Sequence, residues 1–263
     1  YETAIEFKKN GIDPIVLDTR KNPNSEIIKE AKDLNINIKF SYVVVAAKGY
    51  KKVKSADIAK ISDDKKKLSN IENIGCDCIC VSGFWTPTIH LASQSGNKTK
   101  FKNEIDAFIP SQSKQKETTL GSANGIFTLE ETLKTSFEKG SELSRQITNK
   151  ENKIAVPAVV EKKSSNHDKF WCVPLPERKN YKRFLDFQND VSVSDIQLAL
   201  REGYRSIEHV KRYTTLGMAT DQGRTSNLNG LQLVSDIENK VVPQVGHTTF
   251  RPPYSPVSIG AIV

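Results

Sequence analysis

The sequence is poor in several residue types, and each shortage excludes a class of protein. Its 263 residues include one methionine, two tryptophans and four cysteines. Four cysteines in a chain of this length do not make the framework of a disulfide scaffold. No apolar run approaches the roughly 18 residues that a membrane-spanning helix needs, so we do not expect an integral membrane protein. No charged segment followed by an apolar one is visible as a leader, and we expect a cytoplasmic protein.

The charge balance is basic but dispersed. There are 39 Lys and Arg residues against 31 Asp and Glu residues, for a formal charge of +8. Such a balance favours nucleic acid or anionic ligands. The lysine clusters at 48–54, 65–67 and 162–163 carry no interleaved aromatics, and no helix-turn-helix, RNP or zinc-finger pattern occurs. We therefore interpret the lysines as a solvated surface and expect no nucleic acid and no membrane among the partners, keeping a basic nucleic-acid-binding protein as an alternative.

The first half of the chain has the pattern of an α/β protein. Residues 1–10 and 24–34 have the apolar spacing of amphipathic helices, and 12–17 and 35–47 resemble strands. This alternation with short loops indicates a layered α/β domain with a parallel sheet. The chain starts at Tyr1 within a helical pattern, and we expect a fragment of a longer protein.

A further buried strand is predicted over residues 75–82. Cys76, Cys78 and Cys80 alternate there and would face one side of the strand, about 6.8 Å apart. Sulfurs in that arrangement do not converge on one tetrahedral zinc ion without further ligands. We interpret the three cysteines as small apolar core residues and predict no metal site.

The second half of the chain is predominantly helical. Helices are predicted over residues 128–147, 195–202, 205–215 and 226–237, and the polar residues after the first of them read as a linker. The last three helices form a small module around a glycine-containing loop. No Ser-His-Asp, Cys-His or paired-carboxylate constellation can be assembled, so we name no catalytic residue.

Asp18 is the first candidate ligand-binding residue. It follows the strand at 12–17, where dinucleotide-binding units place an acid that accepts from the ribose 2′-hydroxyl. Arg20 beside it would instead favour a 2′-phosphate. The alternative is an ordinary acid at the end of a surface strand.

Residues 121–125 form a second candidate, Gly-Ser-Ala-Asn-Gly, which opens the predicted helix at 128–147. Backbone amides at Gly121 and Asn124 would be able to approach a phosphate. Small residues at this position are equally typical of close packing between a helix and a sheet, and both readings stay open.

The strongest candidate lies between the second and third helices of the module, at residues 217–227. This stretch supplies backbone amides, a guanidinium and two hydroxyls at the start of a helix, which are the components of a phosphate-binding loop. The alternative is an ordinary capped loop. The residues that we predict to contact an anion are Thr215, Gln222, Arg224, Thr225, Ser226 and Asn227.

Long motifs in the chain resemble the alpha subunits of heterotetrameric sarcosine oxidases. The run at 199–227 is nearly free of gaps against that family, and the whole chain fits the same subunit. The other matching stretches are residues 78–91, 122–129, 187–191 and 249–254.

The resemblance implies a layout. Residues 1–73 correspond to the remainder of an inserted NAD-type domain in a disulfide-reductase-like fold, and 74–147 to the returning half of its FAD-type domain. A linker at 148–175 precedes a helical module at 176–240 that resembles bacterioferritin-associated ferredoxin. Residues 241–263 would be an extended linker and the start of a folate-binding, aminomethyltransferase-like domain. The loop at 217–226 has no cysteine, which excludes the iron–sulfur cluster of the ferredoxin relatives.

The resemblance also implies the activity. The family oxidatively demethylates sarcosine to glycine, passing electrons from an FAD on the beta subunit through an FMN at the alpha–beta interface to oxygen, and the one-carbon unit to tetrahydrofolate. This chain would bind NAD and the FMN phosphate and would contact the beta subunit within a complex of alpha, beta, gamma and delta subunits. A subunit of a related amine or opine dehydrogenase is the alternative.

Overall fold

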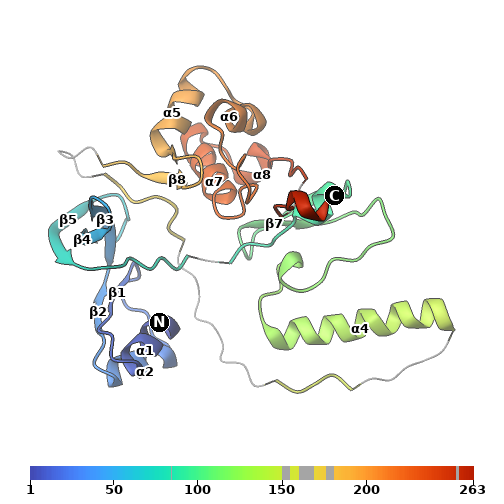
Figure 1. Ribbon diagram of the computed structural model, residues 1–263, viewed down its shortest axis with the longest axis horizontal. Helices are drawn as coiled ribbons and strands as arrows, with labels where there is room; N and C mark the ends of the chain where they lie inside the picture. The colour runs from blue at the N-terminus through green and yellow to red at the C-terminus, as the bar shows by residue number, and fades with distance from the viewer. Residues whose placement is uncertain (84, 150–154, 160–168, 176–180, 253–254) are drawn as a thin grey trace. The chain divides into compact units, whose positions relative to one another are not determined.

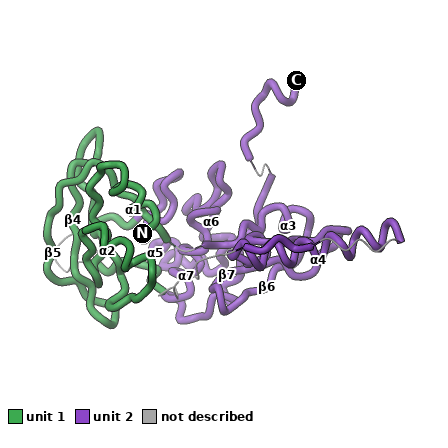
Figure 2. Tube along the Cα trace, turned by 90° about the horizontal axis from the view of Figure 1, so that it is seen from below, with its two compact units in different colours: residues 1–83, 163–183 green, residues 84–162, 184–263 purple. Residues whose placement is uncertain are grey.

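The computed structural model describes residues 1–83, 85–149, 155–159, 169–175, 181–252 and 255–263. The chain divides into two compact units, and each is built from two separate stretches of sequence (Figure 2). Unit 1 comprises residues 1–83 and 163–183, and unit 2 comprises residues 84–162 and 184–263. The fold is mixed α/β, as expected from the sequence.

Unit 1 begins with two helices and a pair of parallel strands (Figure 1). Ile15 pairs with Asn37 and Asp18 with Phe40, so β1 and β2 run in register. The apolar faces of the two helices meet in a small core of Ile5, Ala31 and Ile36. The elements are α1 (Glu2–Lys9), β1 (Ile15–Asp18), α2 (Glu26–Asp33) and β2 (Asn37–Phe40).

The larger sheet of unit 1 is an antiparallel meander of β3 (Tyr42–Gly49), β4 (Val53–Ile61) and β5 (Leu68–Gly75). The predicted parallel sheet is therefore limited to the β1–β2 pair among the described strands. Inward-facing residues of β3 and β4 form a core that is covered by partly buried side chains from residues 170–181. The core residues are Val43, Val45, Ala59 and Ile61, and Phe170, Val173 and Tyr181 lie on them.

The first stretch of unit 2 carries a hairpin, two helical turns and one long helix. These are α3 (His90–Gln94), β6 (Thr99–Lys102), β7 (Ala107–Pro110), η1 (Gly121–Asn124) and α4 (Leu129–Thr148). None of the residues of α4 is buried, although its apolar residues recur at helical spacing.

The second stretch of unit 2 is a compact helical cluster. Its core residues Ile196, Ala199, Val210 and Leu216 are all fully buried. Ser192 begins the first helix, where Asp195 accepts hydrogen bonds from the Ser192 amide and hydroxyl. The elements are β8 (Phe184–Asp186), β9 (Val191–Ser192), α5 (Val193–Arg201), α6 (Ile207–Thr214), α7 (Asn227–Glu238), α8 (Val242–Val245) and η2 (Ile259–Ala261).

Two predicted elements differ from the structure. Residues 76–82 form no strand, and Cys78 and Cys80 are exposed rather than buried. The physical reason is that this stretch has no strand partner among the described residues, although the Cys76 amide donates to Lys54. Gly121–Asn124 does not open the long helix either: Gly125 turns left-handed and ends η1, and α4 begins later, at Leu129.

The expected linker at 148–175 lies partly outside the described residues. Within its described part, Phe170 and Val173 pack on the β3–β5 sheet. The expected extended segment at 241–263 contains one helical turn, α8, and the short η2. Among the described residues, no helix combines the length and the apolar character needed to cross a bilayer.

Candidate functional site

Residues 217–227, which we call the 217–227 loop, lead from the end of α6 to the first residue of α7. A buried aspartate of the β8 strand anchors this loop. The Gly217 amide donates to Oδ2 of Asp186 at 2.8 Å, and the Gln188 amide donates to Oδ1 at 2.9 Å. A buried carboxylate that accepts two backbone amides is well satisfied. Asp186 therefore fixes where the loop leaves α6.

A second aspartate organises the loop from within. Oδ1 of Asp221 accepts the Gly223 amide at 2.9 Å, and Oδ2 accepts the Thr225 hydroxyl at 3.1 Å. This is the pattern of an Asx turn, in which a short carboxylate side chain binds backbone two residues ahead. The loop thus holds a carboxylate as well as a guanidinium.

Asn227 fills the interior of the loop. Its amide nitrogen donates to the Thr248 hydroxyl at 3.0 Å and to the carbonyl oxygen of Gln222 at 3.3 Å. Its Oδ1 lies 2.1 Å from where a Cβ would stand on Gly217 or on Gly223. Both glycines also have left-handed backbone, with φ of 65° and 74°, so both positions need glycine.

Gln222 connects the loop to two other segments. Its Nε2 donates to the Ala219 carbonyl at 3.0 Å, and its Oε1 accepts the Arg251 amide at 3.3 Å. Its own carbonyl lies 3.1 Å from Nε2 of His90 in α3, an arrangement that requires the tautomer with hydrogen on Nε2. The Gln222 side chain is therefore engaged inside the fold.

His90 is buried and stacks on Phe250, with the ring centroids 3.8 Å apart. Burial lowers the pKa of His90 below its ordinary value, and the nearby charge of Arg224 lowers it further. The ring is accordingly neutral at pH 7. It joins α3, the 217–227 loop and the extended segment at 247–251.

Lys211 of α6 holds the same extended segment. Its ammonium group is buried and donates to the Thr249 carbonyl at 3.0 Å, while the Thr249 amide donates to Glu208. Burial lowers the pKa of Lys211 below its ordinary value. The 247–251 segment is thus bound across α6 by two ionisable side chains.

Three predicted side chains lie near the outside of the loop or at the helix start. Thr215 is exposed and ends α6 in left-handed conformation, and Thr225 is exposed as well. Arg224 is half-buried. Thr225 and Arg224 place a hydroxyl and a cation directly before the first turn of α7, a position that favours an anion, whereas the Thr215 hydroxyl donates to the Thr214 carbonyl at the end of α6.

Ser226 differs from its neighbours because it is fully buried. It is the N-cap residue of α7, and its Oγ has no hydrogen-bond partner among the described residues. A buried hydroxyl without a partner is unfavourable in a native protein. The buried Oδ1 of Asn227 also has no hydrogen-bond partner among the described residues. The Ser226 hydroxyl, at the N-terminus of α7, is a structural sign that a further group belongs there.

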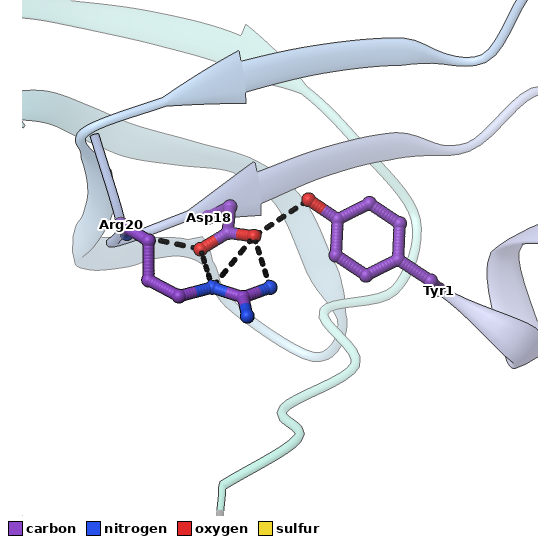
Figure 3. Close-up of polar contacts among 3 residues, drawn as sticks. All are labelled: Tyr1, Asp18 and Arg20. Atoms are coloured by element: carbon purple, nitrogen blue, oxygen red, sulfur yellow. Dashed lines mark hydrogen bonds and ion pairs between the residues drawn. The ribbon is translucent and has the colours of Figure 1, made fainter. Parts of the chain in front are cut away.

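Asp18 lies at the end of β1, as predicted, and both of its oxygens are already bound (Figure 3). Oδ2 accepts the Tyr1 hydroxyl at 2.6 Å and Nη2 of Arg20 at 2.7 Å, and Oδ1 accepts the Arg20 amide at 2.9 Å. Burial opposes ionisation of Asp18, but the hydrogen bonds from Arg20 and Tyr1 outweigh it and lower its pKa. Burial, with the bond to Asp18, raises the pKa of Tyr1.

Gly121 and Asn124 lie in η1. Gly121 is buried with φ of 62°, and a Cβ there would stand 3.1 Å from the Thr132 methyl group of α4. Its side of the turn therefore packs closely on that helix. Asn124 lines a surface pocket together with Lys100 and Glu131.

Asp186 and His90 contact the 217–227 loop, and the sequence did not predict either contact. They lie 31 residues from Gly217 and 132 residues from Gln222 along the chain, and no local pattern connects such distant positions. The motif at 187–191 adjoins Asp186, and the motif at 78–91 contains His90.

Comparisons with known proteins identify relatives along the whole chain. Residues 180–263 match the family model described as the sarcosine oxidase A3 domain. The chain is 32% identical over its whole length to the sarcosine oxidase subunit alpha of Rhizobium meliloti (strain 1021), and 29% identical to that of Corynebacterium sp. (strain U-96). It covers 25% and 28% of these two proteins.

A solved structure is similar as well. The L-proline dehydrogenase from P. horikoshii superposes with a TM-score of 0.54 at 17% identity, over 95% of this chain and 49% of that one. Identity this low supports a shared fold and no more. The sequence matches alone, and not this solved structure, support one assignment: the chain is similar over its whole length to a fragment of sarcosine oxidase alpha subunits, about a quarter as long as the relatives that it matches.

Proposed function

We propose that the chain is part of an amine-oxidising flavoenzyme, an oxidoreductase that acts on the CH–NH bond of a secondary amine and demethylates sarcosine to glycine. The whole-length similarity to sarcosine oxidase alpha subunits supports this proposal. We predict no catalytic residue in this chain, so its proposed role is to bind the cofactor and the partner subunit.

The 217–227 loop is proposed to bind the phosphate of FMN. The observation that carries this proposal is the partnerless Oγ of Ser226 at the start of α7, since a bound phosphate supplies the acceptor that this hydroxyl lacks. Arg224 and Thr225 would provide a cation and a second hydroxyl, with Thr215 nearby. Thr225 would exchange its bond to the Asp221 carboxylate for one to phosphate.

Gln222 and Asn227 have a different role in this proposal. Their amides are bound to Ala219 and Thr248, so they hold the loop in shape. When bound, FMN supplies one- and two-electron chemistry between a donor flavin and oxygen. The protein contributes the binding, orientation and charge around it.

NAD is the second proposed ligand. Asp18 would accept a ribose hydroxyl, sharing its oxygens with Tyr1 and Arg20, and Arg20 would be the residue to meet a 2′-phosphate. Gly121 and Asn124 belong to unit 2 and form a separate candidate, at which the backbone is proposed to approach a phosphate.

The domain layout remains part of the proposal. Residues 1–73 would belong to an inserted NAD-type domain, 74–147 to an FAD-type domain, 148–175 to a linker and 176–240 to a helical module like bacterioferritin-associated ferredoxin without its cluster. Residues 241–263 would lead into a folate-binding domain. The proposed partners are a beta subunit that carries FAD and shares the FMN, and gamma and delta subunits, with tetrahydrofolate accepting the one-carbon unit.

The test is the flavin content of the complex formed by the full-length alpha subunit and its beta partner. We expect the Arg224→Ala/Thr225→Ala variant to lose FMN while the complex stays assembled and FAD stays at its normal level. Thr220→Ala is the matched control. Thr220 is an exposed threonine of the same loop, and its hydroxyl donates to the Gln188 side chain instead of lying at the start of α7. Chromatography of the released flavins gives the FMN to FAD ratio.

A normal ratio in the double variant would show that the loop is only a capped turn. Loss of both flavins together with the complex would refute a specific role in phosphate binding. Oxidation of sarcosine with another electron acceptor but not with oxygen would favour the amine dehydrogenase alternative.

A further inference from the structure

Cys78 and Cys80 lie side by side in the irregular segment that follows β5. Their sulfur atoms are 3.9 Å apart, and both residues are exposed and reduced. Residues 76–83 belong to no helix or strand. The pair was expected to be buried core, so its exposure and its close sulfurs are features that only the structure reveals.

We propose that Cys78 and Cys80 form a redox-active dithiol, which closes to a disulfide on exchange with a small-molecule disulfide of the glutathione class. The sulfurs have to approach each other from 3.9 Å to the roughly 2.05 Å of a disulfide bond. Neither residue is held in a sheet by its neighbours in the described segment, so rotation about their side-chain bonds and a local bend provide the approach.

The bond would be easily reduced. Two residues two positions apart in an extended chain have Cα atoms about 6.8 Å apart, at the upper end of the range that disulfides span. Closing the ring therefore bends the chain, and a strained, exposed disulfide has a more oxidising potential than a structural one. The reaction is reversible for the same reason.

Exchange proceeds in two balanced steps. The Cys78 thiol loses its proton to solvent, and the resulting thiolate attacks one sulfur of the small disulfide and releases one small thiolate. Cys80 then loses its proton and attacks the sulfur of Cys78, which releases the second small thiolate. The protein gives up two electrons and two protons, and one small disulfide becomes two small thiols.

This order of attack follows from the contact between the two thiols. The hydrogen bond with the Cys78 sulfur raises the pKa of Cys80 above its ordinary value. Cys80 thus keeps its proton while Cys78 reacts.

A metal site is a poorer interpretation of the same pair. Two sulfurs leave a tetrahedral ion with at least one protein ligand missing. No group of three or more histidine, cysteine or acidic side chains suited to a metal ion occurs among the residues that the structure describes. We therefore interpret the pair as a dithiol that reacts by thiol–disulfide exchange.

The experiment incubates the full 263-residue chain with defined ratios of oxidised to reduced glutathione, traps free thiols by alkylation at low pH, and maps the peptides by mass spectrometry. We expect the peptide with Cys78 and Cys80 to lose two hydrogen atoms and both alkylation sites. Addition of dithiothreitol should restore both. Cys172, whose sulfur accepts from the Arg183 guanidinium at 3.2 Å, should stay alkylated.

Two single variants test the mechanism. In Cys80→Ser, closure should be lost and Cys78 should carry a persistent glutathione adduct, because no second thiol resolves it. In the matched control Cys76→Ser, closure should be unchanged. Full alkylation of Cys78 and Cys80 in oxidising buffer overturns the proposal, and so does a bond between Cys76 and Cys78 or zinc bound at one equivalent that protects the thiols.

Discussion

Asp57 of β4 should contribute about 1 to 2 kcal/mol to the stability of unit 1 at pH 7. Its buried carboxylate binds the Lys48 ammonium group at 2.8 Å, the Asn73 amide at 2.9 Å and the Tyr181 hydroxyl at 2.7 Å. The hydrogen bond from Lys48 is the main cause that lowers the pKa of Asp57 from 3.8 to about 2. Each pKa unit corresponds to about 1.4 kcal/mol, and partial screening at the half-exposed Lys48 reduces the total.

The perturbation is Asp57→Asn, which keeps the size of the side chain and removes its charge. A lowered folded-state pKa means that the stabilisation is fully present above pH 3.8 and is lost as the pH falls towards 2. The variant should therefore be less stable than the native chain at pH 7, and the difference should shrink towards pH 2.

The assay is urea unfolding at several pH values, followed by tryptophan fluorescence. Trp171 belongs to unit 1 and is partly buried, whereas Trp85 is largely exposed in unit 2. Asp63→Asn is the control, since Asp63 is exposed and pairs with Lys21 on the surface. An Asp57→Asn variant that is as stable as the native chain at pH 7, or whose deficit does not depend on pH, would refute this reasoning.

Two more predictions concern the helical cluster and its loop. Leu216→Ala should cost about 2 to 5 kcal/mol of unfolding free energy, because the side chain is fully buried, whereas Met218→Ala at an exposed position should cost little; calorimetry distinguishes them, and equal melting temperatures would contradict the packing. Gly223→Ala should destabilise by about 1 to 3 kcal/mol, since its Cβ would meet the Asn227 amide on a left-handed backbone. Gly140→Ala, with open space around it in α4, should stabilise slightly. Equal unfolding free energies for Gly140→Ala and Gly223→Ala would show that the loop rearranges around the new methyl group without cost.

Local signals predicted most of the helices. The 3.6-residue apolar spacing located α2, and the helix predicted from residue 195 corresponds to α5, which begins two residues earlier after its N-cap Ser192. The same reasoning predicted Asp18 at the end of β1. These features need nothing from distant parts of the chain.

Non-local partners account for what the sequence analysis got wrong or missed. Residues 76–82 have the alternation of a buried strand, but a strand also needs a neighbour to pair with, and the described structure supplies none. At the 217–227 loop, the sequence gives hydroxyl, amide and guanidinium groups, but it does not show in which direction each side chain points. The Gln222 and Asn227 side chains face inwards because the Arg251 amide and the Thr248 hydroxyl, which come from other segments, bind them there.

The interleaving of the two units has a consequence for how the chain is made. The β3–β5 sheet emerges from the ribosome early, but the residues that cover its core, Phe170, Val173 and Tyr181, follow about a hundred residues later. During that interval the core of the sheet is covered only by Leu68 of β5 among these side chains, and a long loop of chain has to close before the other three reach it. A chaperone that shields nascent strands would therefore matter most while residues 84–183 are being translated, and a product truncated at residue 83 would expose the same surface permanently.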